Sequence, residues 1–196
     1  MNFLAHAYLS FKNDNLLIGN LIADMVKGKQ MEQYPEGICR GIYLHRLIDS
    51  FTDSHPVTIE AKEVFRQSAG RYCGSFLDVA YDHFLALDEY SIPAGGWHKF
   101  ADNCYRAIEK QGGILPAQFC SMYVYMKKED WLSSYGHSWM IERSFDRLKR
   151  RASYLAENAP VFAAFEENYE IIKESYANFF PDLKAYAEQE IKKLLN

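Results

Sequence analysis

Apolar residues recur along this chain at spacings of three and four, the period of an amphipathic helix. Turn and stop signals interrupt the pattern at Gly28, at Pro35 and at the stretches 54–56, 92–96 and 111–116. Between them the spacing predicts helices over residues 2–9, 15–27, 37–53, 57–67, 75–88, 97–110, 117–126, 129–135, 138–157 and 161–192, with the last broken before Pro181. Few stretches alternate with period two, so we expect an all-α protein with a single compact helical domain over residues 1–196.

Polar residues interrupt the apolar faces of four of these predicted helices. The stretch "SFLDVAYDHFLAL" at 75–87, for example, is apolar nearly all the way round yet contains two carboxylates and an imidazole. Few Lys or Arg lie among these residues, and ionised carboxylates seldom enter a core without compensation. The full set is His6, Asp24, His45, Asp49, Asp78, Asp82 and His83.

Two explanations fit this polar set. Each group could be satisfied on its own by a hydrogen bond, as buried polar groups normally are; Asp49, for instance, could pair with Arg46 or Arg40. Taken together, however, three imidazoles and four carboxylates favour ligands that share a divalent metal, whose charge keeps neighbouring carboxylates ionised. A mixed imidazole and carboxylate set suits Mn²⁺, Fe²⁺ or Zn²⁺ better than Ca²⁺.

Composition narrows the class of protein. A net charge of −4 argues against a general nucleic-acid binder. The four cysteines are scattered without a CxxC pair, which is typical of reduced thiols in a cytoplasmic protein. The first residues show no signal-peptide pattern, and no apolar run approaches the length needed to cross a bilayer, so we expect no membrane insertion.

Other catalytic motifs are missing from the sequence. It contains no Glu-x-x-His of the ferritin-like di-iron bundles, no HExxH, no G-x-G-x-x-G, no P-loop and no G-x-S-x-G elbow. The remaining chemistry for a His and Asp cluster is metal-assisted hydrolysis, in which the cation activates a water molecule and neutralises charge on a phosphoryl oxygen.

Several blocks in series resemble one enzyme family. They are "MNFLAHAYLS", "LLIGNLIADMVKG", "GIYLHRLIDSFTDSHP", "LDVAYDHFLAL", "YMKKEDWLSSY" and "FFPDL". In this order they are similar to the acyl carrier protein phosphodiesterases, over nearly the whole chain. The resemblance implies an all-α fold distantly similar to the HD-domain phosphohydrolases. It also implies Mn²⁺-dependent cleavage of the phosphodiester between 4′-phosphopantetheine and a serine of acyl carrier protein.

The resemblance also implies a set of site residues. The matching blocks contain His6, Asn20, Asp24, His45, Arg46, Asp49, Asp78, Asp82 and His83. We interpret His45, Asp82 and His83 as metal ligands, followed by Asp24 and His6. The adjacent His and Asp that give HD domains their name are inverted here, as Asp82-His83.

Three further residues receive supporting roles in this interpretation. Asp78 would orient the attacking water or act as the base. Arg46 would hold a non-bridging phosphate oxygen, and Asp49 would fix a ligand imidazole.

A docking surface for the acidic carrier protein is predicted in "WMIERSFDRLKRRASYLA". An apolar stripe of Ile141, Phe145, Leu148 and Ala152 is expected on one side of this helix. The basic residues on the other side are Arg143, Arg147, Arg150 and Arg151. They could steer an acidic partner, or they could be an ordinary solvated face whose charge nearby acidic residues offset.

Two other functions remain compatible with the sequence. The same metal site could hydrolyse a nucleotide or another small phosphoester. Alternatively, the chain could be a helical carrier-protein-binding module whose polar core serves only to specify packing. The oligomeric state is open.

Overall fold

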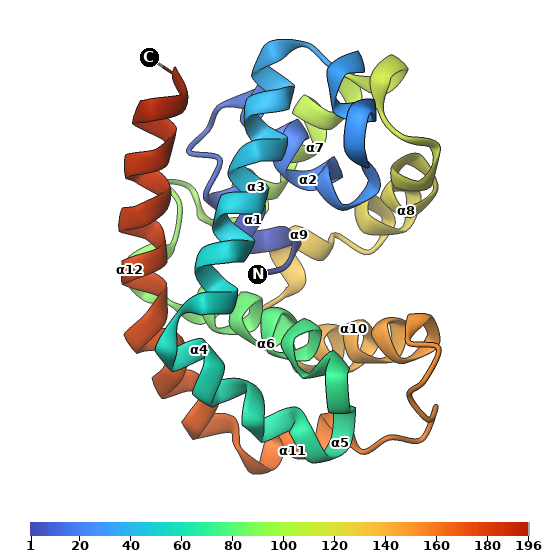
Figure 1. Ribbon diagram of the computed structural model, residues 1–196, viewed down its shortest axis with the longest axis vertical. Helices are drawn as coiled ribbons and strands as arrows, with labels where there is room; N and C mark the ends of the chain where they lie inside the picture. The colour runs from blue at the N-terminus through green and yellow to red at the C-terminus, as the bar shows by residue number, and fades with distance from the viewer. Residues whose placement is uncertain (196) are drawn as a thin grey trace.

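Every regular element is a helix in the computed structural model, which describes residues 1–195 (Figure 1). The α-helices are α1 (Phe3–Tyr8), α2 (Asp14–Ile22), α3 (Glu36–Ser54), α4 (Pro56–Ala61), α5 (Arg66–Ala69), α6 (Cys73–Leu87), α7 (Gly96–Lys110), α8 (Ala117–Lys128), α9 (Trp131–Ser134), α10 (Ser138–Arg151), α11 (Val161–Glu167) and α12 (Tyr169–Leu195). Short 3₁₀ helices are η1 (Ala23–Met25), η2 (Gly28–Gln33), η3 (Lys62–Phe65), η4 (Gly70–Tyr72), η5 (Glu89–Ser91) and η6 (Gly112–Ile114). The prediction of an all-α protein is confirmed.

The sequence signals locate most helices and fail at the C-terminal one. The predicted break before Pro181 is wrong, because α12 runs through this residue and the interruption lies earlier, at Asn168. Phe179, Phe180 and Leu183 around the proline are all buried. Their packing outweighs the loss of one backbone hydrogen bond, which is how tertiary contacts override a local helix breaker. The predicted helix over 138–157 likewise ends earlier, at Arg151.

The helix α6 is the central element of the fold. It packs against α1, α10 and α12, and α12 runs along one side of the molecule (Figure 1). Its apolar side chains are buried almost all the way round, as its sequence predicts. The buried apolar residues of the chain join one hydrophobic core around this helix, so the polar residues of α6 must find partners inside it.

Two other predictions from composition can be compared with the structure. Cys39, Cys73, Cys104 and Cys120 are all free thiols, as expected. Among residues 1–195, no helix combines the length and the apolar character that crossing a bilayer requires. The cytoplasmic location stays a prediction.

A contact between two glycines brings α2 and α3 together. A Cβ atom on Gly41 would lie 2.5 Å from the carbonyl oxygen of Leu16 and 2.9 Å from the Cα of Gly19. A Cβ on Gly19 would lie 2.1 Å from the carbonyl oxygen of Ile38. The two backbones therefore touch at a distance that only glycine permits. This close contact sets the position of Asn20, directly after Gly19, and of His45, one helical turn beyond Gly41.

Replacing Gly41 with alanine should therefore destabilise the protein, because the new methyl group would force the two helix backbones apart. We expect Gly41→Ala to lower the free energy of unfolding by roughly 2–3 kcal/mol, as measured by urea denaturation. Gly74→Ala in α6 is the matched control, since its Cβ would meet only the Lys62 side chain at 3.5 Å. That variant should be neutral or slightly stabilising, and equal losses in both would contradict this account.

Candidate metal centre

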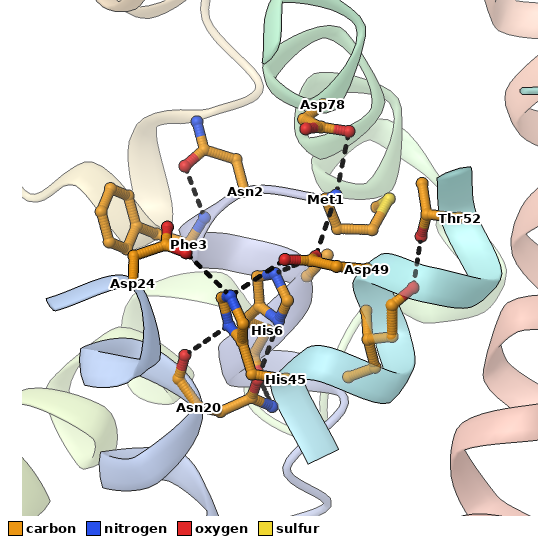
Figure 2. A network of polar contacts seen from close by, with 12 residues as sticks. Met1, Asn2, Phe3, His6, Asn20, Asp24, His45, Asp49, Thr52 and Asp78 are labelled. Atoms are coloured by element: carbon orange, nitrogen blue, oxygen red, sulfur yellow. Dashed lines mark hydrogen bonds and ion pairs between the residues drawn. The ribbon is translucent and has the colours of Figure 1, made fainter. Parts of the chain in front are cut away.

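Two buried histidines form the centre of the site. His6 on α1 and His45 on α3 stack with their ring centroids 4.0 Å apart and an interplanar angle of 19° (Figure 2). Their side chains are almost fully removed from solvent. If both of these rings were protonated to imidazolium, their positive charges would repel each other at this distance.

A single residue, Asn20 at the end of α2, orients both rings. Its Nδ2 donates to the carbonyl oxygen of His6 at 2.8 Å and to Ser10 Oγ at 3.2 Å, so its Oδ1 faces His6. His6 Nδ1 therefore donates to this Oδ1 at 2.8 Å, and His45 Nδ1 donates to the backbone carbonyl of Asn20 at 2.8 Å. In the neutral form of each ring the proton therefore lies on Nδ1, and Nε2 is the nitrogen that can bind a metal.

The Nε2 atoms of both rings lie close to carboxylates. Asp49 lies one turn beyond His45 on α3, with its Oδ2 3.0 Å from His45 Nε2 and its Oδ1 3.2 Å from His6 Nε2. Asp24 Oδ1 lies 3.2 Å from His45 Nε2. Within the described chain His6 Nε2 has no hydrogen-bond partner of acceptable geometry, although it is buried. An orphaned ring nitrogen beside a carboxylate is what a bound cation would satisfy.

The electrostatics of this cluster point the same way. Burial and the neighbouring His45 lower the pKa of His6 to about 4, so its ring is neutral. Burial also opposes a proton on His45, but Asp24 and Asp49 raise its pKa to about 9. Although burial acts against ionisation, the hydrogen bond from His45 holds the pKa of the Asp49 carboxyl well below its usual range. The carboxylates thus require a positive charge, which a proton on His45 supplies when no metal is bound.

The donor atoms fit a divalent transition metal. Ligand atoms of His6, His45 and Asp49 all lie within 4.8 Å of one another, and Asp24 adds a carboxylate on the solvent side. Nitrogen and oxygen donors of this kind suit Mn²⁺, Fe²⁺ or Zn²⁺. The imidazoles are fixed by hydrogen bonds from their far nitrogens, which is the usual arrangement around metal-binding histidines.

The structure does not bring Asp82 into this cluster. Its carboxylate is fully buried and accepts three backbone N–H groups at the start of α1, from Asn2 at 3.2 Å, Leu4 at 2.7 Å and Ala5 at 3.3 Å. Burial raises its pKa to about 7, and these donors act against that shift. The residue satisfies the free N–H groups of a helix N-terminus, so its placement differs from that expected for a metal ligand.

His83 is also separated from the cluster. Its Nδ1 lies 2.8 Å from the carbonyl oxygen of Tyr135 and its Nε2 3.1 Å from the hydroxyl of Tyr169. Phe84 and Phe165 pack against its ring. Both nitrogens already have partners, and the ring lies about 100° round α6 from Asp82, so the structure gives it the surroundings of a structural histidine.

Two further residues of the predicted site, Asp78 and Arg46, make no hydrogen bond or ion pair with the two histidines. Asp78 Oδ1 forms an ion pair with the amino group of Met1 at 2.9 Å, and this amino group lies 3.8 Å from Asp49 Oδ1 (Figure 2). Burial raises the pKa of Asp78, and the Met1 amino group opposes that shift. Arg46 follows His45 on α3 and is exposed, and it makes no hydrogen bond or ion pair within residues 1–195.

The arginines of α10 differ in their availability. Arg143 Nη2 lies 2.9 Å from Glu129 Oε1, and Arg147 pairs with the other oxygen of the same carboxylate. Arg147 also lies over the ring of Trp131, at 4.4 Å from its centroid. Arg150 and Arg151 are exposed and make no ion pair in the described part of the chain. Two of the four predicted arginines thus share one carboxylate, and the other two are unpaired within residues 1–195.

Sequence reasoning understated two residues of this centre. Asp49 was expected to fix an imidazole, whereas it lies against the free nitrogens of both rings. Its spacing of four from His45 was a sufficient signal for direct contact. Asn20 is predicted on the same helix face as Asp24, but nothing in its surroundings in the sequence indicates hydrogen bonds to two histidines.

Comparisons with known proteins identify the family. The family model described as acyl carrier protein phosphodiesterase matches residues 1–183. A relative from Yersinia pestis is 33% identical over 189 residues, covering 96% of this chain and 98% of its own. Relatives from Photorhabdus laumondii and Pectobacterium atrosepticum are each 32% identical, covering 96% of this chain and 96% and 98% of their own. All three are named acyl carrier protein phosphodiesterase.

No solved structure matches the chain. The likeness to HD-domain phosphohydrolases therefore stays a prediction, while the helical fold stands on its own. The family model and the relatives, in contrast, cover nearly the whole sequence at consistent identity. The chain belongs to the acyl carrier protein phosphodiesterase family of enzymes.

Proposed function

We propose that this protein is a metal-dependent phosphodiesterase that releases 4′-phosphopantetheine from holo-acyl carrier protein and leaves the apo form. The names of its relatives support the carrier protein as substrate. The observation that carries the metal dependence is the convergence of the Nε2 atoms of two imidazoles on Asp49, with both Nδ1–H groups donated to Asn20. A bound cation would stabilise two imidazole nitrogens and a carboxylate that lie this close together, whereas apolar packing would not.

His6, His45 and Asp49 would hold the metal, with Asp24 beside them. Bound there, a divalent cation supplies positive charge to the phosphoryl oxygens and makes water a better nucleophile at neutral pH. Asp24 is the most exposed carboxylate of the group, with 83% of its side chain accessible, so it is placed to hydrogen-bond an attacking water. In the reaction, water oxygen bonds to phosphorus, the bond from phosphorus to the serine oxygen breaks, and that oxygen takes a proton.

The first test is mass spectrometry of holo-acyl carrier protein after incubation with the purified protein and Mn²⁺. We expect loss of the prosthetic arm with the wild type and at least a roughly hundredfold slower loss with His45→Ala, because one ligand of the cation is removed. The bound Mn²⁺, measured on the same samples, should fall in parallel. Turnover of a nucleotide panel in place of the carrier protein would contradict the proposed substrate.

Two variants separate ligands from structural carboxylates in the same assay. Asp49→Ala should lose bound Mn²⁺ while remaining folded. Asp82→Asn should keep its Mn²⁺. Its free energy of unfolding should fall by about 1–3 kcal/mol, because a backbone N–H at the start of α1 loses its acceptor. Loss of metal from Asp82→Asn with unchanged stability would restore Asp82 as a ligand, and retention of metal by Asp49→Ala would remove Asp49 from that role.

Metal binding should depend on pH in a defined way. Because the pKa of His45 is raised to about 9 and that of His6 is lowered to about 4, the cluster carries one proton at pH 7. Mn²⁺ must displace that proton, so its affinity should rise about tenfold per pH unit between pH 6.5 and 8. Calorimetry in buffers of different ionisation enthalpy should show about one proton released per ion. An affinity independent of pH would contradict the assigned protonation.

The carrier protein should dock on the unpaired part of the α10 surface. Arg150 and Arg151 are the exposed cations there, whereas Arg143 and Arg147 share Glu129. An acidic partner gains orientation and association rate from such free charges.

Charge reversal tests this docking. The double change Arg150→Glu and Arg151→Glu should raise KM for holo-carrier protein roughly tenfold and flatten its salt dependence. Hydrolysis of bis(p-nitrophenyl) phosphate should hardly change. Arg106→Glu, an exposed arginine of α7, is the control and should leave both substrates unaffected. Equal losses on both substrates would remove the docking assignment.

A further inference from the structure

A groove lies between α8 and α10, beside the metal centre. Its volume is about 390 Å³, within the range of pockets that hold small ligands. Gln118 and Met122 line it from α8, and Ser144 and Leu148 from α10. Figure 1 shows these two helices on the same side of the molecule, with α9 between them and the N-terminus.

The inner end of the groove touches the residues that adjoin the cluster. Asn2, Phe3 and Met25 line it, and Met25 directly follows Asp24, the carboxylate on the solvent side of His45. In Figure 2 Phe3 and Asp24 are drawn on the same side of the two histidines. A phosphodiester bound at the cluster therefore has the groove as a path for one of its two substituents.

The lining is apolar with a few uncharged polar groups. Phe3, Met25, Met122 and Trp131 supply apolar surface, while the amides of Asn2 and Gln118 and the hydroxyl of Ser144 can each donate and accept hydrogen bonds. The guanidinium of Arg147 faces the groove, but Glu129 neutralises it and Trp131 lies beneath it. The other two charged lining residues, Arg150 and Arg151, are exposed and make the groove positively charged where they line it.

We infer that this groove holds the pantetheine arm of the substrate, an inference that rests on the function proposed above. The arm beyond its phosphate is uncharged, with methyl and methylene groups interrupted by two secondary amides and a hydroxyl. Apolar walls with scattered amide and hydroxyl groups match that sequence of groups. A nucleotide in the same place would present a heteroaromatic base and ribose hydroxyls. With the arm in the groove, the serine and its protein stay outside, next to Arg150 and Arg151 at the rim.

A second hollow serves as an internal comparison. It is larger, at about 640 Å³, and lies between η5 and α12. Ala177 and Lys173 line it, and none of its lining residues directly precedes or follows a residue of the cluster, whereas Met25 of the first groove directly follows Asp24. Its size alone would make it a candidate for the arm, so a variant in this hollow is the control for the groove variants.

Calorimetric titration of the full-length, Mn²⁺-loaded protein tests the inference without requiring turnover. The ligands are 4′-phosphopantetheine, methyl phosphate, which lacks the arm, and AMP. The wild type should bind 4′-phosphopantetheine at least about tenfold more tightly than the other two. Gln118→Trp and, on the opposite wall, Leu148→Trp should remove that advantage and leave methyl phosphate binding unchanged, because the new indoles fill the groove. Ala177→Trp, in the second hollow, should retain it.

Each other outcome overturns the inference. Equal binding of 4′-phosphopantetheine and methyl phosphate to the wild type means that nothing holds the arm. An advantage that survives in both groove variants, or disappears in Ala177→Trp, moves the arm elsewhere. AMP binding as tight as 4′-phosphopantetheine binding makes the groove a nucleotide site. Failure of the proposed function is distinct, since it would appear as no release of the arm from holo-carrier protein while these binding differences persist.

Discussion

The arrangement of the site depends on one amide residue. Asn20 accepts a hydrogen bond from His6 Nδ1 with its side-chain oxygen and one from His45 Nδ1 with its backbone oxygen. These two bonds orient the Nε2 atom of each ring toward Asp49. The backbone oxygen is available because it belongs to the last turn of α2, where carbonyl groups lack a partner within the helix. The side-chain oxygen is fixed because the amide nitrogen is already committed to two acceptors. The distance between the two helices is in turn set by the contact of Gly19 with Gly41.

Burial and charge are balanced differently at the two groups of carboxylates. Asp49 and Asp24 are partly open to solvent and lie against imidazoles, so a proton or a metal ion can exchange there. Asp82 is buried, and its carboxylate accepts hydrogen bonds from backbone N–H groups, which are fixed parts of the chain and cannot be replaced by another cation. The first arrangement suits a site that must bind and release a cation, and the second suits a permanent structural contact. Both use the same residue type within a few ångströms of α1.

The helical pattern was sufficient for the fold class and for most helix positions, and it was insufficient where long-range packing decides. Pro181 is a local helix breaker that the buried residues around it override. For the site, sequence reasoning gathered His6, Asp24 and His45, which the structure brings together. It also included Asp82 and His83, which face other partners. Periodicity shows that a polar residue lies on an apolar helix, but not which neighbouring helix that face meets. Asp82 and His83 are consecutive and lie about 100° apart around α6. In this fold the first faces the start of α1 and the second faces Tyr135 and Tyr169.

The capping of α1 by Asp82 has a consequence for how the protein reaches its native state. Helix α1 has six residues, too few to be stable in isolation, and its first N–H groups bond to a side chain 77 to 80 positions further along the chain. Its formation therefore waits for α6, with the entropy cost of closing a long loop. A nascent chain that ends before α6 contains both His6 and His45, but it lacks the Asp82 carboxylate that stabilises the start of the helix carrying His6. We therefore expect the His6–His45 pair to form late in folding, only after the distant segment that contains Asp82 has been synthesised and has packed against α1.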